Sequence, residues 1–379
     1  MMKIPFNRPS IVGKELEYIA QAVQGGQISG DGLFTKKCHA FLENRFGAKK
    51  IMLTTSCTSA LEMSALLCNI QPGDEVILPS FTFVSTANAF CLRGAKPIFV
   101  DIEEKTLNIN PDLIEAKVTK KTKAIVPIHY AGVSCDMDKV MNIGRKYNIP
   151  VIEDAAQGVD AKYRDRYLGT IGQLGAFSFH ETKNFICGEG GALVINDEQF
   201  IERSEIIREK GTNRSKFWRG QVDKYTWVDI GSSYLPSDIL AAYLFAQLES
   251  MEQITTARKI IFEYYSNHLS HLVTKGMLQI PYVPEWCKTN YHMFYCLFPN
   301  EQIRDHIIKV LKEHDILAVF HYLPLHTSPM GKKFGYKEGD LHITEDVSKR
   351  LLRLPFYNNL KEYEQEQIVE IIVKELSKF

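Results

Sequence analysis

The sequence predicts an α/β protein with a large domain built on a seven-stranded, mostly parallel sheet and a smaller C-terminal α+β domain. Short apolar runs rich in strand-forming residues recur through the first half of the chain, and helix-length stretches separate most of them. The pattern changes after about residue 197. The 379 residues and 45% hydrophobic content suffice for one large core and a smaller second core.

The predicted strands are seven runs: residues 51–53, 75–78, 97–102, 124–129, 150–154, 175–179 and 191–195. Helical patterns such as 59–68 and 136–147 lie between them. Continuous apolar strands that alternate with helices are typical of a parallel sheet covered on both faces. The last two runs are close in sequence, so we expect them to pair antiparallel.

Beyond the sheet, residues 198–210 read as a helix, and the polar, basic stretch 211–227 reads as a long loop. Loops of that length in compact domains are usually functional or disordered. A strong helix starts at Ser237, and residues 250–379 alternate helix and strand signals. The predicted domains are therefore 1–249, with an N-terminal arm, and 250–379.

Composition excludes several classes of protein. The 45 basic and 45 acidic residues cancel, so charge gives no case for nucleic acid or an anionic membrane surface. No apolar run of about 18 residues and no signal-peptide pattern occurs, so we expect a cytoplasmic protein. The eight cysteines form no Cys-x-x-Cys pair, which argues against a zinc site, and the chain's size and lack of a secretion signal favour reduced thiols.

Ligands of open α/β sheets bind outside the carboxyl ends of the strands, so the residues that follow each strand are the candidates. Thr58 and Ser59 open a helix whose N-terminus would suit a phosphate, although taken alone they are better explained by plain helix capping. Phe83 follows the second strand and could stack on a planar ring or simply join the core.

Two charged residues follow later strands. Asp154 ends the fifth, where a buried carboxylate requires a cationic partner: a protonated pyridine nitrogen, or a Lys or Arg in a structural ion pair. Lys183 follows the sixth, where burial would lower its pKa and make it a nucleophile, although a single lysine is usually a surface residue. A phosphate-suited helix start, an aromatic, an acid and a lysine thus occur in order.

This set resembles the DegT/DnrJ/EryC1/StrS sugar aminotransferases. The matching segments are SCTSAL at 56–61, PSFTF at 79–83, EDAAQ at 153–157, SFHETKN at 178–184 and GEGG at 188–191. The resemblance extends from Ile4 to Pro355 and implies the aspartate aminotransferase-like fold (fold type I) and a homodimer. Segments 207–215, 221–227, 231–234 and 319–326 most resemble transaminases that form dTDP-4-amino-4,6-dideoxygalactose.

The resemblance implies a role for each matching position. Lys183 would hold pyridoxal 5'-phosphate (PLP) as a Schiff base, and Asp154 would pair with the pyridine nitrogen. Gln157 would approach the ring hydroxyl, and Phe83 would lie against the ring. Thr58, Ser59 and Ser178 would bind the phosphate. Many relatives carry an asparagine at the position of Ser233 that reaches the partner subunit's cofactor, and the shorter serine here could take that role.

The implied reaction moves the amino group of L-glutamate to the C4 ketone of a dTDP-linked 4-keto-6-deoxyglucose. Basic residues in or beside the long loop, notably Lys210, Arg214 and Arg219, are candidates for binding the diphosphate, or else form a solvated basic loop. The resemblance places His321 and His326 near the sugar, whereas an isolated histidine is more often structural.

Four alternatives remain at this point. A sugar dehydratase on the same fold would replace Lys183 with histidine. A C3 transaminase, or a C4 enzyme giving the gluco epimer, would keep every residue above. A regulatory protein on an inactive fold would have lost Lys183 or Asp154. A nicotinamide oxidoreductase needs its glycine motif after a strand, whereas the glycines at 169, 172 and 175 precede one.

Overall fold

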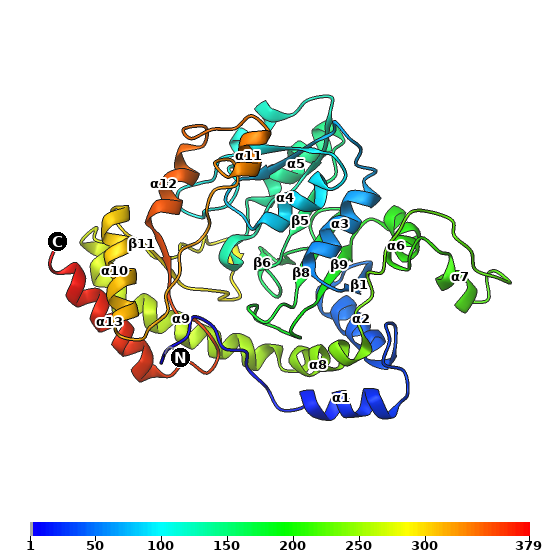
Figure 1. Ribbon diagram of the computed structural model, residues 1–379, viewed down its shortest axis with the longest axis horizontal. Coiled ribbons are helices and arrows are strands. Elements are labelled where there is room, and N and C mark those ends of the chain that lie inside the picture. Colours follow the sequence, from blue (N-terminus) through cyan, green and yellow to red (C-terminus); the bar gives the residue numbers. More distant parts are fainter. Residues whose placement is uncertain (1–2) are drawn as a thin grey trace.

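The computed structural model describes residues 3–379, so the first two residues of the predicted domain 1–249 lie outside it (Figure 1). Two hydrogen-bonded sheets form one continuous layer, because bridges join Ile125 to Val151 and Ile128 to Asp154. The strands are β1 (Lys50–Thr54), β2 (Glu75–Pro79), β3 (Lys96–Val100), β4 (Thr122–Ile125), β5 (Ile152–Asp154), β8 (Leu174–Ser178) and β9 (Gly191–Ile195).

The strand order in this layer is β1-β9-β8-β5-β4-β2-β3. Only β9 runs antiparallel to its neighbours, so the predicted mostly parallel sheet and the antiparallel last pair are both confirmed. The predicted strand 124–129 is too long, because its regular pairing ends at Ile125. Pro127 has no N–H to donate to a ladder, and its carbonyl instead accepts from the Asp154 N–H at 2.9 Å.

Helices cover both faces of the sheet, as the alternation of side chains along β1 shows. Ile51 and Leu53 pack with one core cluster, whereas Met52, between them, packs with another. The first cluster includes residues of α1 (Glu15–Gln24), α2 (Leu33–Phe46), α5 (Met137–Tyr147) and α8 (Asp238–Glu249). The second includes residues of α3 (Cys57–Leu67), α4 (Val84–Cys91) and α6 (Ile201–Arg208).

The chain passes into its C-terminal part between α8 and α9 (Met251–Thr274), with Ser250 as the residue between the two helices. The division at 249/250 stays a prediction, since Ile4 of the N-terminal arm also belongs to the core cluster that fills this C-terminal part. Its other elements are β10 (Cys287–Lys288), β11 (Tyr295–Leu297), α10 (Glu301–Glu313), α11 (Pro329–Lys333), α12 (His342–Arg350), β12 (Leu351–Arg353) and α13 (Glu362–Leu376).

The segment between β9 and α8 differs from the prediction in two details. The predicted helix 198–210 consists of a 3-10 turn, η4 (Glu198–Phe200), followed by α6, which ends at Arg208. The predicted loop 211–227 contains a short helix, α7 (Arg214–Trp218), which protrudes from the body of the molecule (right in Figure 1). The remaining short elements are η1 (Pro111–Leu113), η2 (Glu115–Lys117), η3 (Tyr130–Gly132), β6 (Lys162–Tyr163) and β7 (Arg166–Tyr167).

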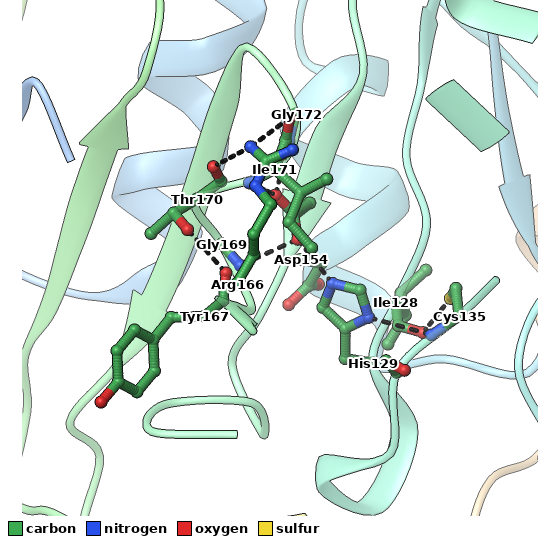
Figure 2. Close-up of polar contacts among 12 residues, drawn as sticks. Ile128, His129, Cys135, Asp154, Arg166, Tyr167, Gly169, Thr170, Ile171 and Gly172 are labelled. Atoms are coloured by element: carbon green, nitrogen blue, oxygen red, sulfur yellow. Dashed lines mark hydrogen bonds and ion pairs between the residues drawn. The ribbon is translucent and has the colours of Figure 1, made fainter. Parts of the chain in front are cut away.

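A buried carboxylate beneath the sheet edge fixes the end of β5. Glu153 is fully buried and accepts four hydrogen bonds: from the backbone N–H groups of Gly169, Ile171 and Gly172 at 2.6–2.8 Å, and from His129 Nε2 at 2.8 Å. His129 Nδ1 in turn accepts from the Cys135 N–H (Figure 2). Because side chains alternate along a strand, anchoring Glu153 on one face holds Asp154 toward the other.

No helix within residues 3–379 is both long enough and apolar enough to cross a membrane.

Candidate active site

A cavity of about 580 Å³ opens at the carboxyl ends of β5 and β8, a size typical of small-molecule sites. The N-terminal turn of α3, the start of α4, the ends of β5 and β8 and the turn after β8 supply one wall. Residues of the C-terminal part supply the other, namely His292, His321, Tyr322 and Arg353. The cavity therefore lies between the two cores, at the edge of the sheet where the sequence predicts a ligand.

Lys183 lines this cavity from the turn after β8, where its backbone N–H donates to the His180 carbonyl at 2.9 Å. Within the described residues its amine has no carboxylate within ion-pairing distance. Burial is the largest effect and lowers the pKa of Lys183; Cys57 opposes it, Arg353 lowers the pKa further, and Asp154 raises it least. A larger fraction of this amine is therefore neutral near pH 7 than for a lysine in water.

Asp154 lines the same cavity from the end of β5 and is only 5% exposed. Its Oδ2 accepts from Thr86 Oγ1 at 2.7 Å, and its Oδ1 accepts from the Ala156 N–H at 3.1 Å. Among residues 3–379, no Lys or Arg forms an ion pair with it, so the structural ion pair considered from the sequence is not present. A nearly buried carboxylate thus faces the cavity without a cation.

Three other predicted residues reach the cavity. Gln157 accepts from the Ala131 N–H at 2.7 Å and donates to Tyr322 OH at 3.0 Å, so both ends of its amide are held. Phe83 is 58% exposed and lines the cavity, which excludes the plain core role. Ser178, at the end of β8, is nearly buried and accepts a long, 3.4 Å hydrogen bond from the His180 N–H.

The start of α3 combines capping with cavity lining. Ser56 caps the helix, because its hydroxyl accepts from the Ser59 N–H at 3.1 Å. Thr58 faces the cavity and donates to Ser85 Oγ at 2.9 Å. Ser59 does not line the cavity, and its hydroxyl contacts Thr55 and Ser56 instead. The structure therefore separates two residues that the sequence places together: Thr58 faces the cavity and Ser59 belongs to the cap.

The two predicted histidines lie in different environments. His321 lines the cavity, whereas His326 lies outside it and is fully buried. Both ring nitrogens of His326 are occupied, Nδ1 by Ser80 Oγ at 2.8 Å and Nε2 by Glu345 Oε1 at 2.9 Å. This histidine thus packs the C-terminal part against the end of β2 and does not reach the space beside Lys183.

The predicted diphosphate contacts line a second cavity of about 940 Å³, not the one that contains Lys183. Each of the three basic residues pairs with an acid of the same segment: Lys210 and Arg214 with Glu209, and Arg219 with Glu205, at 2.8–3.1 Å. Ser233 lines this second cavity as well. Within one chain these four residues are therefore remote from the cavity of Lys183.

Sequence reasoning overlooked several residues that line the cavity. Tyr322 lies inside a segment quoted for the resemblance and Thr86 lies just beyond another, and their hydrogen bonds to Gln157 and Asp154 now give them a role. Arg353 lies two residues before the end of the resemblance, and only the fold shows that it lines the cavity. His292 has no signal in the sequence, since it lies in a segment without regular structure and only the fold brings it here.

Comparison with known proteins gives the family. The sequence model of the DegT/DnrJ/EryC1/StrS aminotransferase family matches residues 9–373. The chain belongs to this family. It is 33% identical to the spore coat polysaccharide biosynthesis protein SpsC of Bacillus subtilis, over 97% of this chain and 96% of that protein. It is 34% identical to the uncharacterized protein MJ1066 of Methanocaldococcus jannaschii, over 99% of this chain and 98% of that protein.

Solved structures agree with the family assignment. The putative sugar aminotransferase Spr1654 of Streptococcus pneumoniae, in its apo and PMP forms, superposes with a TM-score of 0.91 at 25% identity, over 99% of this chain and 98% of that one. A PLP form of Spr1654 has the same fold. The predicted fold type I architecture is thus confirmed, and the expected PLP cofactor is confirmed at the level of the family.

Proposed function

We propose that this aminotransferase uses PLP to move the amino group of L-glutamate to the C4 ketone of dTDP-4-keto-6-deoxyglucose, giving dTDP-4-amino-4,6-dideoxygalactose. The observation that carries the proposal is the charge pattern of the 580 Å³ cavity: among residues 3–379, Asp154 has no cationic partner, and Lys183 and Arg353 have no anionic partner. PLP and its substrates carry the complementary groups, namely a protonated ring nitrogen, a phosphate and a carboxylate. The cofactor therefore fits the residues present.

In this proposal six residues would hold the cofactor: Lys183, Asp154, Gln157, Phe83, Thr58 and Ser178. Bound PLP would supply the electron-withdrawing ring that stabilises negative charge on the carbon losing its proton. Asp154 would favour the protonated ring nitrogen, because a nearby carboxylate stabilises a cation. The hydroxyls of Thr58 and Ser178, beside the start of α3, would bind the phosphate.

Lys183 would act a second time, as the group that moves the proton. Once substrate occupies the cavity, its amine takes a proton from one carbon and returns it to another as general base and acid. Such a base must be neutral before it can accept a proton, and burial lowers the pKa of Lys183 in that direction. Two half-reactions in one cavity imply ping-pong kinetics, in which the donor product leaves before the sugar binds.

Similarity to other proteins supports a sugar as the amino acceptor. SpsC is named for spore coat polysaccharide biosynthesis, and Spr1654 is described as a putative sugar aminotransferase. The choice of the C4 carbon, the galacto product and the dTDP carrier rests on segments 207–215, 221–227, 231–234 and 319–326 of the sequence. Transfer at C3, or formation of the gluco epimer, are the alternative outcomes of the same experiment.

The substrate proposal predicts a defined product. Incubation of the enzyme with PLP, L-glutamate and dTDP-4-keto-6-deoxyglucose should give 2-oxoglutarate and an amino sugar in equal amounts. NMR coupling constants should then show an axial amino group at C4. An equatorial C4 amine or a C3 amine would change only the assigned position and configuration of the amino group. Failure to form an amino sugar from any keto sugar would contradict sugar transamination.

We also propose a homodimer, because a single chain gives no role to the second cavity or to the protruding segment, residues 211–227. The segment exposes Trp218 to 70% and Trp227 to 77%, which is unusual for large aromatic side chains on a free surface. In a dimer this segment would lie against the partner, and Ser233 and Arg214 could then contribute to the partner's cavity.

Light scattering after size exclusion should therefore give twice the 43.3 kDa chain mass. Trp227→Ser should weaken the dimer measurably, whereas Trp286→Ser, a change of another exposed tryptophan in the C-terminal part, should not. A fully active monomer at nanomolar concentration would contradict the proposal.

A further inference from the structure

His321 presents one free ring nitrogen within the Lys183 cavity. Its Nδ1 lies 3.0 Å from the hydroxyl oxygen of Tyr130. Its Nε2 has no hydrogen-bond partner among residues 3–379, and the side chain lines the cavity. One side of the imidazole is thus held by the protein and the other is available to a ligand.

The surroundings of Tyr130 decide which nitrogen carries the proton. Tyr130 is 1% exposed, and within the described part of the chain His321 Nδ1 is the sole hydrogen-bond partner of its hydroxyl. If Nδ1 carried the proton and donated it, the buried phenol hydrogen would have no acceptor, which is costly. If the phenol donates, every buried polar hydrogen of the pair is satisfied, and the proton of the imidazole is on Nε2.

The charges around the pair keep both groups neutral. Burial lowers the pKa of His321 well below its usual value, and the cations Arg353 and Lys183, with His292, lower it further. Burial also raises the pKa of Tyr130 well above its usual value, although Arg353 opposes this and Tyr322 and Tyr295 add to it. The pair is therefore a neutral phenol beside a neutral imidazole.

We propose that His321 is a fixed hydrogen-bond donor, through Nε2–H, to an oxygen of the acceptor sugar at or next to the reacting carbon, and that Tyr130 is the positioning residue that sets this tautomer. The inference rests on the proposed function and deepens it. A neutral N–H donor matches a ketone or hydroxyl oxygen, whereas the charged groups of the ligands match Lys183, Arg353 and Asp154. His321 and Lys183 line the same cavity, so the donor faces the space in which the amine acts on the substrate.

Two substitutions of His321 distinguish the role of its Nε2 from the role of its Nδ1. In His321→Gln the amide can reproduce the Nε2–H donor, whereas in His321→Asn the shorter amide reproduces the Nδ1 position only. Tyr130→Phe removes the hydroxyl that sets the tautomer and leaves the ring packed against Phe81 and Tyr295. The two half-reactions are measured separately, as cofactor absorbance changes with L-glutamate and then with keto sugar.

The acceptor half-reaction should slow by about 10- to 100-fold in His321→Asn and in Tyr130→Phe, and by much less in His321→Gln. Only the first two variants lose the N–H donor that is directed at the sugar oxygen. The glutamate half-reaction should change less than about threefold in all three. Equal losses in both half-reactions, or equal effects of Gln and Asn, would overturn the inference. A wild-type enzyme that reacts with glutamate but with no keto sugar would instead overturn the proposed function.

A second measurement is independent of turnover. In protein labelled with ¹⁵N-histidine, the His321 resonances should show the Nε2–H tautomer in the wild type and a mixture of tautomers in Tyr130→Phe. The signals should stay those of a neutral ring near pH 7, because burial holds the pKa of His321 well below its usual value. A wild-type ring protonated on Nδ1, or charged at pH 7, would overturn the inference.

Discussion

Lys183→Ala is expected to abolish transamination and to leave the purified protein colourless after PLP is added and unbound cofactor is removed. The amine is the group that would hold the cofactor covalently and move the proton. Loss of proton transfer alone lowers rates by about 10²- to 10⁴-fold. Because Lys183 also has no carboxylate partner among the described residues, removing it breaks no ion pair of the fold.

The measurement combines absorbance with mass spectrometry. Borohydride reduction of the wild type with PLP should add the mass of the cofactor to the peptide that contains Lys183 and to no other lysine in stoichiometric amount. Lys259→Ala, a change at an exposed residue of α9, is the matched control and should keep full colour and activity. Full activity in Lys183→Ala would refute the assigned role.

Asp154→Asn is expected to keep PLP binding and to lose turnover by about 10²- to 10³-fold, the range seen when one preorganised electrostatic contact is removed. The amide has nearly the same shape as the carboxylate, so the fold and the cavity should survive. It carries no charge, so it no longer stabilises the protonated ring nitrogen. The loss should appear in both half-reactions, because both depend on the same ring.

Thr86→Val provides the matched control. It removes the 2.7 Å hydrogen bond that Asp154 accepts and leaves the charge in place. The two variants together separate charge from hydrogen bonding, so Thr86→Val should lose less than about tenfold. If Thr86→Val were as inactive as Asp154→Asn, or if Asp154→Asn were nearly normal, charge on the cofactor ring would not explain the role of Asp154.

The sheet and much of the cavity were predictable from the sequence because both depend on local patterns. Apolar runs mark the strands, and residues that follow parallel strands gather at one sheet edge, so Lys183, Asp154, Gln157 and Thr58 meet there as predicted. The end of β4 was missed by four residues, because Pro127 interrupts pairing inside an apolar run.

The opposite wall was harder to predict, since it comes from segments with no short-range signal. His321 and His326 lie five residues apart on one stretch, yet one lines the cavity and the other is buried against Ser80 and Glu345. Arg214 and Arg219 of the long loop pair with acids at the end of α6 and within it, a contact that neither residue type nor spacing reveals. The isolated charge of Arg353 likewise depends on packing between the two cores.

The most direct test of the central claim is a crystal structure of the enzyme grown with PLP. The account predicts density continuous from Lys183 into the cofactor, with the Asp154 carboxylate within hydrogen-bonding distance of the ring nitrogen and the phosphate beside Thr58 and Ser178. Cofactor bound elsewhere, or a ring nitrogen that faces solvent or an uncharged side chain, would contradict it.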